Sequence, residues 1–169
     1  MRRVRRLAAL GACFLGGCLG YHAGPLPGEP ADATFARVEG ARVRYVDEGR
    51  GAPVVLIHGF ASSLGRWNDV RPALVARGHR VLAMDLKGFG WTDRPEGDYS
   101  PDAQARLVLA LMDARGIERT ALVAHSWGSS VALALALRAP ERVTRLALYG
   151  AYVYEGQRNT FFQWADADG

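Results

Sequence analysis

The sequence has few of the residues that bind metals or form disulfides, with four histidines and two cysteines among 169 residues. No group of cysteine, histidine and acidic residues has the spacing of a metal site. A glycine-rich loop of the kind that cradles phosphates is also missing. The sequence therefore indicates neither a metal nor a cofactor.

Outside the N-terminal segment, neither basic nor acidic residues are in excess. The formal net charge of +4 equals the contribution of four arginines in the first six residues, Arg2, Arg3, Arg5 and Arg6. From residue 18 onward, basic and acidic residues balance, so the rest of the chain has no basic stripe of the kind that binds nucleic acid. We therefore exclude nucleic acid as a partner.

The apolar run near the N-terminus is too short to cross a membrane, which takes about 20 residues. This run, Leu7 to Leu15, follows the basic "MRRVRR" and precedes "LGGC", which ends at Cys18. The order resembles a bacterial lipoprotein signal, in which the cysteine receives the lipid. "LGAC", ending at Cys13, fits the same pattern but has a shorter apolar run before it. We expect residues 1–18 to be a lipoprotein signal and Cys18 to anchor the protein to a membrane of the cell envelope. Plain secretion is the alternative.

Composition divides the remaining chain into three parts. Residues 19–33 are rich in proline and glycine and have few large apolar groups, so we expect a tether. Residues 34–152 have the length and apolar content of one globular domain, or of the N-terminal part of one. Residues 153–169 are expected to be the start of a cap over the active site or an unfolded tail.

Two kinds of strand pattern occur in residues 34–152. Apolar and charged residues alternate in "ARVRYVDEG" (41–49), which predicts a strand with one buried face, and residues 34–40 are its expected partner. Continuously apolar runs instead predict strands that are covered on both faces, as in a parallel sheet. These runs are 53–59, 80–86 and 120–126, and residues 142–151 also have strand character.

Helix signals lie between these strands. Ser62 and Ser63 can cap a helix with Trp67, Val70 and Leu74 on one face. Ser100 and Pro101 begin a second helix, and a third follows Ser126. Strands and helices that alternate along the chain predict a three-layer α/β/α sandwich with a mostly parallel sheet.

A serine lies at one of the expected strand-to-helix turns, in the run "VAHSWGSS". A nucleophile elbow needs a serine at a strained turn with small residues two positions away on either side. Ala124 and Gly128 meet this need around Ser126, with alanine in place of the usual first glycine. A serine that only caps the helix has similar local requirements.

Three further motifs occur in matching order and spacing, and with them the chain resembles the α/β-hydrolase superfamily from about residue 34 to about residue 152. They are "HGF" with the later serines and tryptophan (His58 to Trp67), "DLKGFGWTDRP" (Asp85 to Pro95) and "PERV" (Pro140 to Val143). The fold implied by the resemblance is the α/β-hydrolase fold, truncated after about the sixth strand.

The resemblance also implies roles for single residues. Ser126 would attack an acyl carbonyl, and the backbone N–H groups of Phe60 and Trp127 would bind the resulting oxyanion. His58 and His125 would support the scaffold. The partner implied is a small-molecule substrate.

The same family places its catalytic acid and histidine after the serine, in that order. No histidine follows His125, so the chain lacks the general base and we expect it to be inactive as given. It is then the N-terminal part of a serine hydrolase that needs a C-terminal segment or a second chain. A membrane-tethered remnant or binding module without catalysis is the alternative.

The expected substrates are esters, or compounds with a reactive carbon–carbon bond, that are small and largely apolar. "SWGSS" also resembles the proline iminopeptidases, but these carry a glycine- and proline-rich loop after the His-Gly pair, which "HGFASS" does not have. A peptidase of this kind is therefore the second choice.

Overall fold

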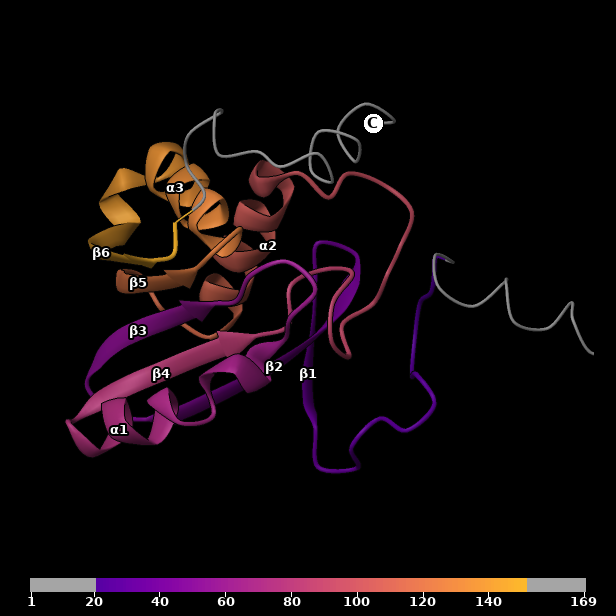
Figure 1. The fold of residues 1–169 in the computed structure, drawn as a ribbon, viewed down its shortest axis with the longest axis horizontal. Helices are drawn as coiled ribbons and strands as arrows, with labels where there is room; N and C mark the ends of the chain where they lie inside the picture. Colours follow the sequence, from indigo (N-terminus) through magenta and orange to yellow (C-terminus); the bar gives the residue numbers. More distant parts are fainter. Residues whose placement is uncertain (1–20, 152–169) are drawn as a thin grey trace, which may run out of the picture.

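The computed structural model describes residues 21–151, which form one six-stranded sheet with helices on both faces (Figure 1). The order of strands across the sheet is β1-β2-β4-β3-β5-β6. The strands are β1 (Thr34–Val38), β2 (Ala41–Gly49), β3 (Ala52–Ile57), β4 (His79–Met84), β5 (Thr120–His125) and β6 (Val143–Tyr149).

The sheet is antiparallel at one side and parallel elsewhere. β2 pairs antiparallel with β1 and β4, whereas β4, β3, β5 and β6 run parallel to one another. This arrangement confirms the predicted mostly parallel sheet. Because parallel strands end at the same edge, the loops that follow β3, β4, β5 and β6 meet there, and this is where open α/β sheets bind ligands.

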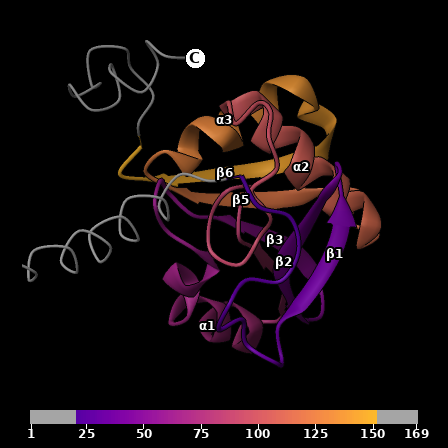
Figure 2. The same cartoon turned by 90° about the vertical axis from the view of Figure 1, so that its right-hand side faces the viewer.

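Helices cover the two faces unequally. In both views, α2 (Pro101–Ala114) and α3 (Gly128–Arg138) lie on one face and α1 (Val70–Ala76) lies on the other (Figures 1 and 2). The helix signals of the sequence are borne out for α2: the Ser100 hydroxyl accepts a hydrogen bond from the Ala103 amide at 3.2 Å, and Pro101 occupies the first turn. The predicted three-layer sandwich is therefore confirmed.

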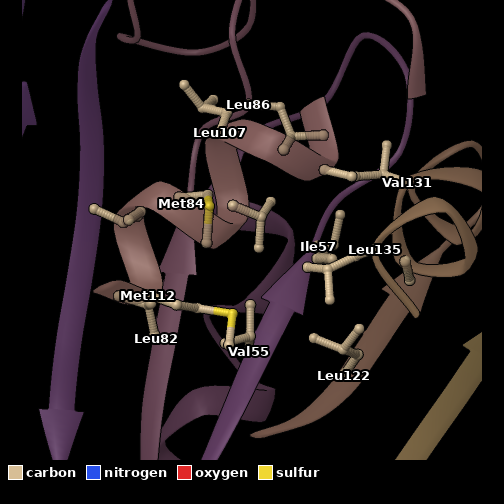
Figure 3. Packing of buried hydrophobic residues seen from close by; sticks show 14 of the residues in the cluster. Val55, Ile57, Leu82, Met84, Leu86, Leu107, Met112, Leu122, Val131 and Leu135 are labelled. Atoms are coloured by element: carbon tan, nitrogen blue, oxygen red, sulfur yellow. The ribbon is translucent and has the colours of Figure 1, made fainter. Parts of the chain in front are cut away.

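Each face of the sheet has its own apolar core. The larger core joins alternate residues of β3 and β4 to α2 and α3 through contacts such as those of Val55 and Leu82 with Met112 (Figure 3). The smaller core joins the other residues of β3 and β4 to α1 and to the 3-10 turn η1 (Leu64–Trp67). Burial on both faces explains why these two strands are continuously apolar.

Strand β5 differs from this expectation, although its sequence is also continuously apolar. Its residues alternate between buried and half-buried, and Ala121 and Val123 are the half-buried ones on the face of the smaller core. The reason is that on that face α1 packs against β4 and β2 and η1 packs against β3 and β4, so within residues 21–151 the cover ends before β5.

The single helix expected after Ser63 is divided into two elements. Ser63 caps the short turn η1, and α1 begins only at Val70, which is 37% exposed instead of lying on the buried face. Asn68 and Asp69, which lie between the two elements, are poor helix formers, as is Gly65 within η1. Trp67 and Leu74 do pack on the smaller core, as predicted.

Residues 21–33, expected to be a tether, lie instead against the loop that follows β4. His22 and Arg94 exchange two backbone hydrogen bonds of 2.7 and 2.6 Å, and the Gly24 amide donates to the Asp93 carboxylate at 2.8 Å. Glu29 forms a bidentate ion pair with Arg42 on β2, with both bonds at 2.6 Å. Composition suggested a free linker, and it could not indicate these contacts because the partner residues are distant in sequence.

Other expectations fall on residues outside those described. Cys18 and the signal segment, like residues 153–169, lie beyond residues 21–151, so lipidation and the cap stay predictions. Within residues 21–151, no helix is both long enough and apolar enough to span a membrane.

A charged cluster fixes the end of α2 to the sheet. The Asp47 carboxylate on β2 accepts hydrogen bonds from Arg80 on β4 at 2.9 and 2.7 Å and from Arg115, the C-cap residue of α2, at 2.9 Å. The carboxylate is 9% exposed. These bonds, with Arg80 contributing most, hold the pKa of Asp47 below its ordinary value of 3.8, although burial opposes the shift.

We predict that Asp47→Asn lowers the free energy of unfolding by about 2 kcal/mol at pH 7. A depressed pKa stabilises the fold fully above the unfolded value of 3.8, and this contribution disappears as pH falls through the folded value. The difference between wild type and variant should therefore shrink below pH 3.8 in urea unfolding curves. Asp69→Asn is the control, since no side-chain cap bond forms at Asp69. A difference that stays constant down to pH 2 would refute the role of the carboxylate.

Candidate active site

The turn between β5 and α3 has the conformation that a nucleophile elbow requires. Ser126 has φ of 53°, in the left-handed region that residues with a Cβ atom rarely adopt. Its amide donates to the Tyr149 carbonyl at 2.9 Å, and its carbonyl accepts from the Ser129 amide at 2.9 Å. The surrounding structure therefore holds the serine in a strained turn at the carboxyl edge of the sheet.

Small residues around this turn allow the backbones to come close. A Cβ atom at Gly128 would lie 2.9 Å from the Ile57 carbonyl oxygen and closer still to that of His58. A Cβ atom at Gly59 would lie 3.0 Å from the Ser126 Cβ atom. Ala124 is completely buried, so its methyl group is accommodated in place of the usual glycine.

The two proposed oxyanion donors flank Ser126 from different loops. Trp127 is the N-cap residue of α3, whose first N–H groups have no partner within the helix and carry its positive dipole end. Phe60 follows β3, and its neighbour Ala61 also has a left-handed φ, of 52°. The Phe60 and Trp127 rings face each other edge-on at 6.3 Å, so the two loops lie side by side.

His58 connects the loop after β3 to the loop after β4. It is completely buried, its Nε2 accepts from the Leu86 amide at 2.9 Å, and its Nδ1 lies 2.7 Å from the Gly59 carbonyl. An acceptor role at Nε2 and a donor role at Nδ1 define the neutral ring. Burial is the largest influence on the pKa of His58 and lowers it from the ordinary value. The predicted scaffold role is confirmed.

Asp85 performs a similar function, which the sequence motif alone did not assign. It is completely buried directly after β4, and its carboxylate accepts from the Leu64 amide at 2.6 Å and from the Trp91 amide at 2.9 Å. Arg44 lies 3.6 Å away. Asp85 thus joins the start of η1 to the loop after β4. Its position at the end of a buried strand was the available signal.

Gln104, also missed, fixes the same loop from α2. Its side chain is completely buried, accepts from the Lys87 amide at 3.0 Å and donates to the Lys87 carbonyl at 2.9 Å. A polar residue on the buried face of a helix was the signal that could have identified it.

The contacts of the remaining histidines are with other groups than Ser126. His125 stacks on Tyr149 with ring centroids 5.4 Å apart, and burial, followed by the charge of Arg66, lowers its pKa. His79 lies at the amino end of β4, 3.3 Å from the Ala52 carbonyl, and His22 pairs with Arg94. Among residues 21–151, which include all four histidines, no hydrogen bond joins a histidine ring to Ser126.

An open cavity of about 620 Å³ lies at the opposite edge of the sheet, before β5 and β6. Of its charged side chains, Arg142 donates to the Asp113 carboxylate at 2.6 Å and Arg119 donates to the backbone carbonyl of Glu141 at 3.0 Å. The cavity lies at the other edge of the sheet from the turn at Ser126, so the carboxyl edge remains the candidate site. The part of the chain that the structure describes also contains no cluster of possible metal ligands.

A family model described as "alpha/beta hydrolase fold" matches residues 52–169, and the chain belongs to this family. The elbow, the loops around it and the sheet order that position them are thus those of a hydrolase of this fold type.

Two curated relatives are named as hydrolases. The chain is 39% identical over 115 residues to 2-hydroxymuconate semialdehyde hydrolase of Pseudomonas sp. strain CF600, covering 66% of this chain and 41% of the relative. It is 38% identical over 115 residues to 2-hydroxy-6-oxo-2,4-heptadienoate hydrolase of Pseudomonas putida strain F1, covering 66% and 42%. The chain therefore spans about two fifths of the length of these relatives.

Solved structures show the same likeness. A meta-cleavage product hydrolase from Pseudomonas fluorescens IP01 matches with a TM-score of 0.67 and 41% identity, covering 70% of this chain and 44% of that chain. An epoxide hydrolase from Vigna radiata matches with a TM-score of 0.66 and 32% identity, covering 69% and 37%.

We predict that Ser126→Gly raises the free energy of unfolding by about 1 kcal/mol, because glycine adopts the left-handed region without a Cβ penalty. Ser126→Ala keeps the strain and should match wild type. Ser130→Gly is the matched control: the same exchange within α3 should destabilise the protein by about 1 kcal/mol. Chemical unfolding measures all three. Equal stability of Ser126→Gly and Ser126→Ala would contradict the strained turn.

Proposed function

We propose that Ser126 is the nucleophile of a hydrolase that works through an acyl-enzyme. The Ser126 oxygen attacks the substrate carbonyl, its proton passes to a base, and the carbonyl oxygen becomes an oxyanion bound by the Phe60 and Trp127 amides. Collapse of this intermediate expels the leaving group, and water then hydrolyses the ester on Ser126. The observation that carries the proposal is the left-handed φ of 53° at Ser126, in a turn that closely approaches Gly59 in the loop of Phe60.

The proposed substrates are small, largely apolar compounds cleaved at a carbon–carbon or ester bond. Support comes from the names of two curated relatives, which are hydrolases of 2-hydroxymuconate semialdehyde and of 2-hydroxy-6-oxo-2,4-heptadienoate. The aromatic rings of Phe60 and Trp127 beside Ser126 offer an apolar wall for such compounds. A serine at the elbow distinguishes the site from the epoxide hydrolases that the fold also resembles, because those use aspartate.

The base and its acid partner are proposed to come from a further segment or from a second chain. In this family they follow the serine in the sequence, and the chain spans about two fifths of the relatives that carry the named activities. Without a base, the oxyanion site alone still leaves a residual acceleration, whereas the full rate is lost by several orders of magnitude.

A chimera tests the proposal. Residues 21–151 are joined to the part of the Pseudomonas sp. CF600 hydrolase that lies beyond its matched region, and hydrolysis of 4-nitrophenyl acetate and of 2-hydroxymuconate semialdehyde is measured. The 169-residue chain should retain only the residual acceleration of the oxyanion site, and the chimera should exceed its rate at least about 10³-fold.

The matched control is the same chimera with Ser126→Ala, which should return to background. A folded chimera whose turnover survives Ser126→Ala would overturn the nucleophile. A folded chimera that binds the dienoate without turning it over would favour the alternative, a binding module without catalysis. Cleavage of proline 4-nitroanilide in preference to both substrates would favour the iminopeptidase.

A further inference from the structure

A run that the proposed chemistry does not use, Gly88–Phe89–Gly90, presents one aromatic ring to both oxyanion loops. The Phe89 ring lies 5.6 Å from the Phe60 ring and 5.9 Å from the Trp127 ring, measured between centroids. It also meets the His58 ring edge-on at 5.6 Å. Phe89, Phe60 and Trp127 thus form a closed triangle of rings, and two of its corners are the residues with the proposed donors.

The backbone that carries Phe89 is fixed on both sides. Its amide donates to the Leu86 carbonyl at 3.0 Å, and its carbonyl accepts from the Thr92 amide at 3.1 Å. The Thr92 hydroxyl in turn donates to the Asp85 carbonyl at 2.7 Å. The same loop is held by the bonds already described to the side chains of Asp85, His58 and Gln104.

The two glycines that flank Phe89 are required by close contacts. A Cβ atom at Gly88 would lie 2.6 Å from the Tyr99 ring, and one at Gly90 would lie 2.7 Å from one Asp85 carboxylate oxygen and closer to the other. Both glycines also have left-handed φ angles, of 89° and 51°. The backbone on either side of the ring is therefore confined, and the ring is presented from a stiff turn.

The loop that carries Phe60 contains a strained residue beside an exposed ring. The Phe60 side chain is 42% exposed, and Ala61 after it is held in a strained conformation. Such strain persists only where neighbouring structure maintains it. Edge-to-face aromatic pairs contribute about 0.5–1.5 kcal/mol each beyond the burial of area, so the contact with Phe89 is of the size needed to hold this loop.

Resting on the function proposed above, we propose that Phe89 is a positioning residue that sets the distance between the Phe60 and Trp127 amides. Phe89 touches neither the nucleophile nor the donors' N–H groups in this role. It acts through the side chains of the two donor residues, and the fixed Gly-Phe-Gly turn holds the Phe89 ring in place.

The test uses the full 169-residue chain and an alkyl fluorophosphonate, whose phosphorus forms a bond to the Ser126 oxygen while fluoride leaves and hydroxide takes the proton. Intact-mass spectrometry follows the rate of labelling at pH 9. An oxyanion site without a base retains residual acceleration, so wild type should label at Ser126 faster than N-acetylserinamide does. Misplacement of a donor by about 1 Å costs up to about 10²-fold, so Phe89→Ala and Phe89→Leu should label at least about 10-fold more slowly.

Two variants separate positioning from general loss of stability. Phe89→Tyr keeps the ring and should label at the wild-type rate. Leu109→Ala removes apolar volume from α2, where Leu109 packs against the same core, and should also label at the wild-type rate. Circular dichroism and urea unfolding show which variants are folded.

The outcomes distinguish this inference from the function on which it rests. Wild-type labelling that survives Ser126→Ala, or that is no faster than N-acetylserinamide, overturns the proposed function. Labelling that needs Ser126 but is unchanged in folded Phe89→Ala overturns the role of Phe89 alone. Equal slowing in Leu109→Ala also overturns it, because the effect would then reflect stability. If Phe89→Ala fails to fold, the labelling rates of Phe89→Leu and Phe89→Tyr are compared by the same criteria.

Discussion

The close approach of three backbone segments at one edge of the sheet is the constraint on which the site depends. The turn at Ser126 fits only because Gly128 has no side chain where the Ile57 and His58 carbonyls pass, and because Gly59 leaves room for the Ser126 Cβ atom. The same close contacts hold the Ser126 backbone in its left-handed conformation, which it would leave without them. The strain at Ser126 therefore follows from how β3 and α3 pack.

Buried polar side chains fix the loops next to this turn. His58, Asp85 and Gln104 are completely buried, and each is paired with backbone groups of a neighbouring loop. Backbone amides in loops need such partners when they are shielded from water, and an unpaired one costs about 1–3 kcal/mol. These three residues thus stabilise loops that have little regular structure. The aromatic triangle around Phe89 rests on the loop that they hold.

The sequence predicted the parts of the fold that depend on local pattern. The continuously apolar β3 and β4, the alternating β2 and the capped start of α2 occur where composition placed them, because burial and capping leave a local signal. Small residues around Ser126 predicted the sharp turn for the same reason. The break between η1 and α1 was missed, although Gly65 and Asn68 signal it.

Contacts between distant segments could not be read in the same way. Nothing near His22 or Glu29 in sequence indicates that residues 21–33 bind Arg94 and Arg42, since composition alone favours a linker. The roles of Asp85, Gln104 and Phe89 likewise depend on which loops meet at the edge of the sheet. The motif from Asp85 to Pro95 indicated the family but not the contacts that the residues of the motif make.

The central claim is that Ser126 and the amides of Phe60 and Trp127 converge on one oxygen atom. A crystal structure of the chain after reaction with the fluorophosphonate tests it most directly. The account predicts phosphorus bonded to the Ser126 oxygen, with the phosphoryl oxygen about 2.7–3.1 Å from both amide nitrogens. An adduct on another residue, or a phosphoryl oxygen that faces solvent and meets neither amide, would contradict the account.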